Sequence, residues 1–128
     1  MTTAPFPLLK HAPISKNTRV LVRADFDVPV RNGAVADDFR IQAGLPSFRF
    51  ILQKGGCLRL VSHRGRPQGK KIPSLSLKPV MRYLERILKR EVVFIRNPFE
   101  AKIMERHAND TKILLFENMR FWPGEEAN

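Results

Sequence analysis

Cationic and polar side chains recur in this sequence directly after its short apolar segments. The first such segment, residues 19–23, leads into two aspartates, and a later one, residues 57–62, leads into a histidine and two arginines. Arginine binds phosphate and carboxylate oxygens in bidentate fashion. These side chains are therefore candidates for holding an anion: Arg23, Asp25, Asp27, Arg40, His63, Arg64, Arg66, Glu117, Asn118 and Arg120.

The apolar segments must be placed by a fold that brings these side chains together. Short aliphatic runs predict strands over residues 19–23, 57–62, 91–95 and 112–116. Helical spacing of apolar residues predicts helices that follow them: one ending before Gly55-Gly56, which Pro46 kinks or splits, one over 76–90 capped by Ser76, and one over 98–107. This alternation predicts an α/β fold, a doubly wound, Rossmann-like parallel sheet sandwiched by helices. Because ligands bind at the carboxyl ends of such strands, the candidate side chains should share one edge of the sheet.

The segment VSHRGRPQGKK, residues 61–71, allows two interpretations. Arg64-Gly65-Arg66-Pro67 resembles peptides that lie in the minor groove of A/T-rich DNA, and the same residues could form a tight loop around a phosphate. Groove-binding peptides usually lie in flexible, polar surroundings, whereas this segment joins a predicted buried strand to a predicted helix. The context favours the phosphate loop, and Lys70 and Lys71 leave non-specific nucleic-acid binding open.

The composition fits one globular domain with anionic partners. Among 128 residues the formal net charge is +11, which favours nucleic acid, acidic lipid or phosphorylated metabolites without choosing among them. Cys57 is the only cysteine, which excludes an intrachain disulfide and a cysteine-based zinc site and fits a reducing cytoplasm. The sequence has no signal peptide and no apolar run long enough for a membrane span, so a cytoplasmic location is expected. It also lacks both glycine-rich nucleotide motifs, and His11 and His107 have no partners at metal-ligand spacing, so no nucleotide or metal site is expected within it.

Five motifs in order resemble the amino-terminal part of the phosphoglycerate kinase family. RVLVRADFDVPV resembles the family's R-V-D-F-N-V-P, and DDFRI resembles D-D-x-R-I. SHRGRPQGK resembles S-H-L-G-R-P-x-G, SLSLKPV resembles S-L-x-P-V, and LLFENMRFWPGEE resembles L-L-E-N-x-R-F-x-x-G-E-E. The resemblance covers about residues 19–128, and it identifies residues 64–67 with the family's substrate loop.

The resemblance implies a glycolytic kinase that transfers a phosphoryl group between 1,3-bisphosphoglycerate and ADP with magnesium. Residues 1–128 would form a partial amino-terminal, 3-phosphoglycerate-binding domain, and the carboxyl-terminal domain that binds Mg-ATP or Mg-ADP would not be part of the chain. Arg40 would face the transferred phosphoryl group as the catalytic residue. The remaining substrate-binding positions would be Arg23, Asp25, Phe26, Asp27, His63, Arg64, Gly65, Arg66 and Arg120.

Three departures from the family pattern bear on this expectation. The family has asparagine at Asp27, and a carboxylate about 5 Å from an anionic substrate would cost about 3 kcal/mol at an effective dielectric near 20. The family usually has an aliphatic residue at Arg64, which is expected either to offset Asp27 or, in preference, to point to solvent. The chain ends at Asn128, inside the last motif, so we expect no turnover by these residues alone and self-association through an exposed strand at Arg19–Arg23.

Two other functions stay open at this point. A basic nucleic-acid-binding module would use residues 64–67 to contact DNA. A non-catalytic anion-binding domain would reuse the same fold without transferring a phosphoryl group.

Overall fold

Four parallel strands form the centre of the computed structural model, which describes residues 7–127. Their order across the sheet is β1-β4-β6-β5, and every neighbouring pair is parallel. The strands are β1 (Arg19–Arg23), β4 (Cys57–Val61), β5 (Val92–Ile95) and β6 (Ile113–Phe116). All four predicted strands are therefore present, and the predicted parallel α/β fold is confirmed.

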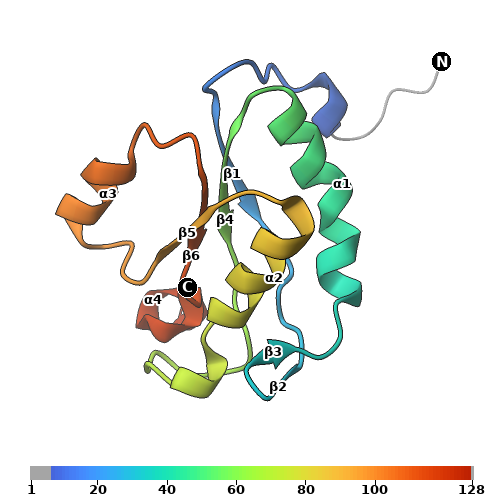
Figure 1. Ribbon diagram of the computed structural model, residues 1–128. Helices are drawn as coiled ribbons and strands as arrows, with labels where there is room; N and C mark the ends of the chain where they lie inside the picture. The colour runs from blue at the N-terminus through green and yellow to red at the C-terminus, as the bar shows by residue number, and fades with distance from the viewer. Residues whose placement is uncertain (1–6, 128) are drawn as a thin grey trace.

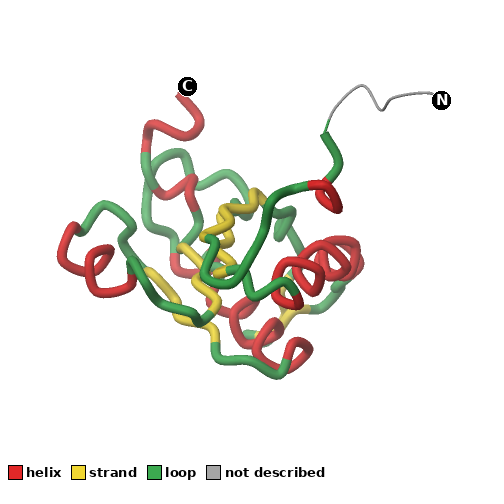
Figure 2. Tube along the Cα trace, turned by 90° about the horizontal axis from the view of Figure 1, so that it is seen from above, coloured by secondary structure: helices red, strands yellow, loops and turns green. Residues whose placement is uncertain are grey.

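Helices cover the sheet on both faces, as Figures 1 and 2 show. The two longer helices, α1 (Phe39–Gln53) and α2 (Lys78–Leu88), lie on one face, where Leu58 and Leu60 of β4 join the main apolar core. The short helix α3 (Ala101–His107) covers β5 and β6 on the other face, where Leu114 and Phe116 form a smaller core. In β4, β5 and β6, alternate residues supply the two cores because successive side chains of a strand point to opposite faces, whereas β1 contributes only Val20 and Val22, both to the main core.

Helix α1 answers one of the two alternatives predicted for Pro46, a kink or a split. The helix runs unbroken from Phe39 to Gln53, so the proline does not split it. A proline inside a helix removes one backbone hydrogen bond, and α1 offsets this loss by burying Ile41, Phe48 and Ile51 completely in the main core.

Two side chains accept hydrogen bonds from backbone N–H groups at the start of α2, and the sequence predicts one of them. The Ser76 hydroxyl accepts from the Lys78 backbone N–H at 3.1 Å, as predicted. The Glu117 carboxylate, which follows β6, accepts from the Leu77 N–H at 2.9 Å. The helix is amphipathic, and its apolar residues Val80 and Leu84 are buried against the sheet.

Shorter elements complete the connections between the strands. A two-residue turn with positive φ at Asn32 and Gly33 joins the strands β2 (Val30–Arg31) and β3 (Ala34–Val35), as the primed hairpin turns require. Three 3₁₀ helices and a short α-helix occupy the remaining segments: η1 (Leu9–His11), η2 (Pro73–Leu75), η3 (Met119–Phe121) and α4 (Pro123–Ala127).

Strand β1 lies at one edge of the sheet. It pairs with β4 along its whole length, and within residues 7–127 no strand pairs with its other side. The side chain of Leu21 at its centre is 67% exposed.

No helix of the described part of the chain is long and apolar enough to cross a membrane.

Candidate anion-binding site

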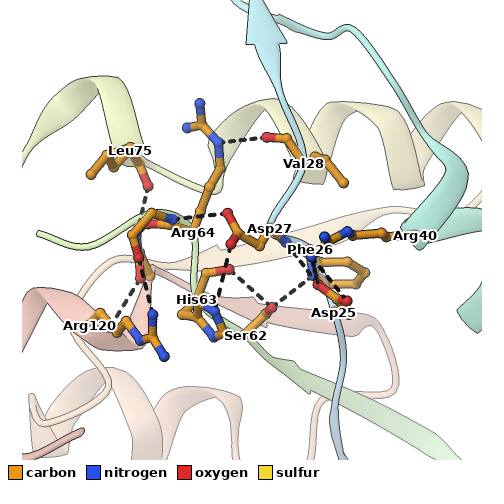
Figure 3. Close-up of polar contacts among 12 residues, drawn as sticks. Asp25, Phe26, Asp27, Val28, Arg40, Ser62, His63, Arg64, Leu75 and Arg120 are labelled. Atoms are coloured by element: carbon orange, nitrogen blue, oxygen red, sulfur yellow. Dashed lines mark hydrogen bonds and ion pairs between the residues drawn. The ribbon is translucent and has the colours of Figure 1, made fainter. Parts of the chain in front are cut away.

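The carboxyl ends of β1, β4 and β6 bring three loops together. Residues 24–29 follow β1, residues 62–72 follow β4, and residues 117–122 follow β6. Figure 3 shows Asp25, His63, Arg40 and Arg120 at this edge, as the strand order requires. The structure therefore brings these four of the candidate side chains to one edge of the sheet.

Ser62 joins the first two loops. Its hydroxyl donates to the Ala24 carbonyl at 2.7 Å and accepts from the Phe26 backbone N–H at 3.0 Å. Ser62 is buried at the end of β4, so these hydrogen bonds fix the loop after β1 against the loop after β4. The role of Ser62 was not predicted, because nothing in its residue type or spacing distinguishes it from other serines in loops.

Asp27 and Gly65 form the next connection between these loops. One Asp27 carboxylate oxygen accepts from the Gly65 N–H at 3.0 Å, and the other lies 3.9 Å from Nε2 of His63. Gly65 has a φ of +64°, and a Cβ at this position would lie 2.8 Å from the Leu75 side chain. The left-handed conformation favours glycine here, and any larger residue would also have to displace the end of the Leu75 side chain.

Asn118 fixes the third loop to the second. Its side chain is fully buried, and its amide donates to the carbonyls of Arg64 at 2.7 Å and Leu75 at 2.9 Å. Its side-chain oxygen accepts from the Arg120 N–H at 3.1 Å. Asn118 therefore positions the backbone on both sides of the site.

Arg64 does not point to solvent, which corrects the preferred expectation for this residue. It is 8% exposed, and its guanidinium donates to the carbonyls of Val28 at 3.0 Å, Ser74 at 2.7 Å and Ser76 at 3.2 Å. Burial lowers the pKa of its guanidinium, and the Asp27 charge partly opposes that shift. In Figure 3 the Arg64 side chain points toward Val28 and away from Arg120, so it ties two loops together and does not face the site.

The side chain of Phe26 also points away from the site and into the core. The ring is 1% exposed and packs edge-on against Phe48, with 6.0 Å between the ring centroids. The ring is buried because an aromatic side chain is more stable in the core than in solvent. The predicted contact of Phe26 with a ligand is therefore open only to its backbone.

Arg40 and Asp25 lie together at the open side of the site. Their closest side-chain atoms are 3.4 Å apart, and both side chains are more than half exposed. An exposed ion pair of this kind contributes little stability. Arg40, at the start of α1, is therefore able to exchange this contact for one with an anion.

Glutamates of α4 contact two of the predicted cations. Arg23 donates to Glu125 at 2.9 Å, and Arg120 donates to the other oxygen of the same carboxylate at 3.0 Å. Arg120 also lies 3.7 Å from Glu126. Burial disfavours the charged form of Glu125, but the hydrogen bonds from Arg23 and Arg120 outweigh it and lower the pKa of the carboxyl from its ordinary value of 4.5.

These contacts with α4 were not predicted from the sequence. Arg23 and Glu125 are 102 residues apart, and the only available signal was the acid pair that follows Arg120 in a basic chain. The Glu125 carboxylate shows that the guanidinium groups of Arg23 and Arg120 are placed to bind one oxyanion between them.

Arg66 is an exposed cation of the second loop. Its side chain is exposed, and within residues 7–127 it forms no hydrogen bond or ion pair with another side chain. The segment that holds it is nevertheless fixed, because the Gly69 N–H donates to the Arg120 carbonyl at 3.0 Å. Arg66 is thus a charged side chain on a rigid loop.

The described residues do not fit a metal site. No group of three or more His, Cys, Asp or Glu side chains in this part of the chain is placed to hold a metal ion, and the carboxylates of Asp25 and Asp27 contact Arg40 and Gly65 instead. No step of the chemistry is therefore assigned to a metal held by these residues.

Comparison with known proteins identifies close relatives of this site and fold. The family model described as phosphoglycerate kinase matches residues 11–128. Curated phosphoglycerate kinases from Akkermansia muciniphila and Desulforapulum autotrophicum are 40% and 45% identical over 116 and 112 residues, which are 89% and 85% of this chain. The solved phosphoglycerate kinase of Coxiella burnetii superposes with a TM-score of 0.77 over 92% of this chain, at 29% identity.

These matches cover the chain far more fully than they cover the relatives. The chain spans 29% of the length of both curated relatives and of the Coxiella burnetii structure. The match nevertheless includes all three loops of the candidate site, and the family model extends over nearly the whole sequence. The chain therefore belongs to the phosphoglycerate kinase family.

Proposed function

We propose that residues 1–128 are part of the amino-terminal domain of a phosphoglycerate kinase and bind 3-phosphoglycerate or 1,3-bisphosphoglycerate. The observation that carries this proposal is the gathering of four arginines and one histidine from four segments at or next to the carboxyl ends of the strands: Arg23, Arg40, His63, Arg66 and Arg120. Figure 3 shows Arg40, His63 and Arg120 of this set. Such a set neutralises a phosphorylated substrate, which is what phosphoryl transfer chiefly requires of a protein.

The geometry supports a different task for each side chain. His63, Arg66 and Arg120 would bind the 3-phosphate, with Arg23 adjacent to Arg120 through their shared contact with Glu125. Asp25 and Asp27 would orient the glycerate end of the substrate. Arg40 would face the transferred phosphoryl group after releasing Asp25, from which it is 3.4 Å away.

Glu125 must leave this position when substrate binds. A phosphate held by Arg23 and Arg120 would meet the carboxylate that now contacts both. We therefore expect α4 to move when substrate binds, at the cost of two ion pairs that together contribute about 1–2 kcal/mol, since Arg23 is largely exposed.

Catalysis by the complete enzyme would take place in glycolysis in the cytoplasm and would require Mg-ATP or Mg-ADP. The family relatives support this need for a nucleotide, and the residues of this chain supply the glycerate side of the reaction. We expect residues 1–128 alone to bind substrate without turning over ATP.

Calorimetric titration distinguishes this proposal from DNA binding. 3-Phosphoglycerate should bind with defined stoichiometry, and Arg66→Ala should weaken binding by about 1.5–3 kcal/mol, the scale of a charge-assisted hydrogen bond. A short A/T-rich duplex should bind no better than a G/C-rich one. An A/T preference that Arg66→Ala abolishes would instead support the nucleic-acid module, although the burial of Arg64 is unfavourable for an extended peptide in a groove.

A second measurement distinguishes a kinase domain from a non-catalytic anion-binding domain. Residues 1–128 would be combined with the carboxyl-terminal domain of a related phosphoglycerate kinase, and ATP turnover would be followed by a coupled assay. Turnover that Arg40→Gln removes while 3-phosphoglycerate binding persists supports the kinase, and binding without turnover supports the anion-binding domain.

Self-association is a further part of the proposal. The free side of β1 presents backbone donors and acceptors around the exposed Leu21, and an open apolar edge is a template for pairing with another chain. We propose that two copies associate through this edge.

A further inference from the structure

A second cavity, of 530 Å³, has a lining distinct from the proposed glycerate site. It lies where the start of α2, the carboxyl end of β5 and the turn between β2 and β3 meet. None of the four arginines and the histidine assigned to glycerate binding lines it. Its volume is in the range of small-molecule sites.

Four cationic side chains line this cavity, and none is neutralised by an acid. Two come from α2, one from the end of β5 and one from the segment after the substrate loop. Within the described part of the chain, none of the four forms a side-chain hydrogen bond or ion pair. They are Lys71, Lys78, Arg82 and Arg96.

The one acid in the lining, Glu117, is already engaged. Its carboxylate accepts from the Ser76 hydroxyl at 2.7 Å, the Leu77 N–H at 2.9 Å and the Asn118 N–H at 2.8 Å. Glu117 thereby occupies the amino-terminal end of α2. An anion that enters the cavity would therefore be bound by the four cationic side chains and not by the helix terminus.

The rest of the lining is apolar. Phe94 and Phe121 contribute aromatic rings, and Pro73 and Pro79 contribute aliphatic ones. Phe94 is partly buried in β5 and packs against the main core, so its ring is held in place. Inorganic phosphate would use the cations and leave this apolar surface exposed to water.

We propose that this cavity binds an organic phosphate, a molecule that joins a doubly charged phosphate group to an apolar or aromatic body. Arg82 and Arg96 would bind the phosphate oxygens as bidentate donors, with Lys71 and Lys78 adding charge. Phe94 and the two prolines would cover the apolar body. This site is separate from the proposed glycerate site and does not depend on it.

Fluorescence titration with 1-naphthyl phosphate tests the proposal, at about pH 8 so that the phosphate is a dianion. The probe should bind the 128-residue chain at least about ten-fold more tightly than inorganic phosphate, because only the probe buries an apolar body. Arg82→Gln combined with Arg96→Gln should weaken binding by about ten-fold or more. Phe94→Leu should weaken the probe and leave inorganic phosphate unchanged.

Two controls separate this site from general attraction to a basic protein. Arg90→Gln combined with Arg106→Gln removes the same charge from exposed positions outside the cavity, and it should leave binding unchanged. Arg66→Met should also leave it unchanged, although it impairs the proposed glycerate site. Equal loss in the Arg90 and Arg106 pair, equal affinity for probe and inorganic phosphate, or no binding of the probe would each overturn the proposal.

Discussion

Replacing Arg64 by methionine should destabilise the protein, whereas the same replacement at Arg66 should not. Arg64 is buried and donates to three carbonyls, those of Val28, Ser74 and Ser76. Arg66 is exposed. The two arginines are separated only by Gly65, so the pair tests whether one loop divides structural and binding roles between neighbouring side chains.

The magnitude follows from the contacts of Arg64. Hydrogen bonds from a charged donor contribute about 1.5–3 kcal/mol each, but three donated by one group are not additive. Burial lowers the pKa of Arg64, which means that desolvation of its charge opposes part of this gain. Methionine restores some apolar burial, so we expect Arg64→Met to lower the free energy of unfolding by about 2–3 kcal/mol.

Urea unfolding followed by circular dichroism measures this difference. A loss of 2–3 kcal/mol should shift the midpoint by about 1–2 M urea, at a slope near 1.5 kcal/mol/M. Arg66→Met should stay within about 0.5 kcal/mol, as surface substitutions do, and should lose affinity for 3-phosphoglycerate. Calorimetry on the same samples, well below the unfolding midpoint, gives the affinity.

Equal behaviour of the two variants would contradict this division of roles between Arg64 and Arg66. An Arg64→Met protein as stable as the parent would mean that desolvation cancels all three hydrogen bonds. A destabilised Arg66→Met protein would mean that Arg66 has partners in the folded state.

Four further outcomes are expected. Asp27→Asn should strengthen 3-phosphoglycerate binding by about 1 kcal/mol, because the amide keeps an acceptor for the Gly65 N–H while a partly exposed repulsive charge is removed; calorimetry would show weaker binding if Asp27 instead has a favourable role. Glu125→Gln should also strengthen binding, because it frees Arg120. The pKa of Glu125 is lower in the folded protein than its ordinary value of 4.5, so its ion pairs stabilise α4 above pH 4.5. This stabilisation is lost as the pH falls below that value, toward the folded-state pKa. The fluorescence of Trp122, the single tryptophan, which lies between η3 and α4, should show this change in the parent protein and not in Glu125→Gln. Leu21→Lys should reduce the sedimentation-measured association of two copies, because a charge on an edge strand opposes pairing.

Matched variants control these measurements. Phe39→Lys adds the same charge at another highly exposed apolar residue, outside β1, and should leave association unchanged. Glu105→Gln removes a carboxylate from the exposed side of α3 and should alter neither substrate affinity nor the pH dependence of Trp122. A change in either control would trace the effect to net charge.

Much of the fold could be predicted from the sequence because it depends on local patterns. The strand β1 and the helix α2 follow from aliphatic runs and from apolar residues at helical spacing. The edge at which candidate side chains gather follows from parallel strands, since residues after each strand share one end of the sheet.

Other features could not be predicted because they depend on distant segments. Pro46 is kept inside α1 because the helix packs on the sheet, and the residues next to Pro46 in the sequence do not show this packing. The contact between Arg23 and Glu125 joins residues 102 positions apart. Ser62 and Glu117 acquire their partners only when the loops after β1, β4 and β6 meet.

The sequence alone determined that His63, Arg64 and Arg66 follow a buried strand and that this edge of the sheet is cationic. The tertiary structure decided which of these side chains face a ligand. Gly65, at a φ of +64°, separates Arg64, which is buried against three carbonyls, from Arg66, which is exposed. The reason is that burial of a guanidinium is tolerated only where acceptors surround it, and the acceptors for Arg64 come from loops after β1 and before α2 that no local pattern places beside it.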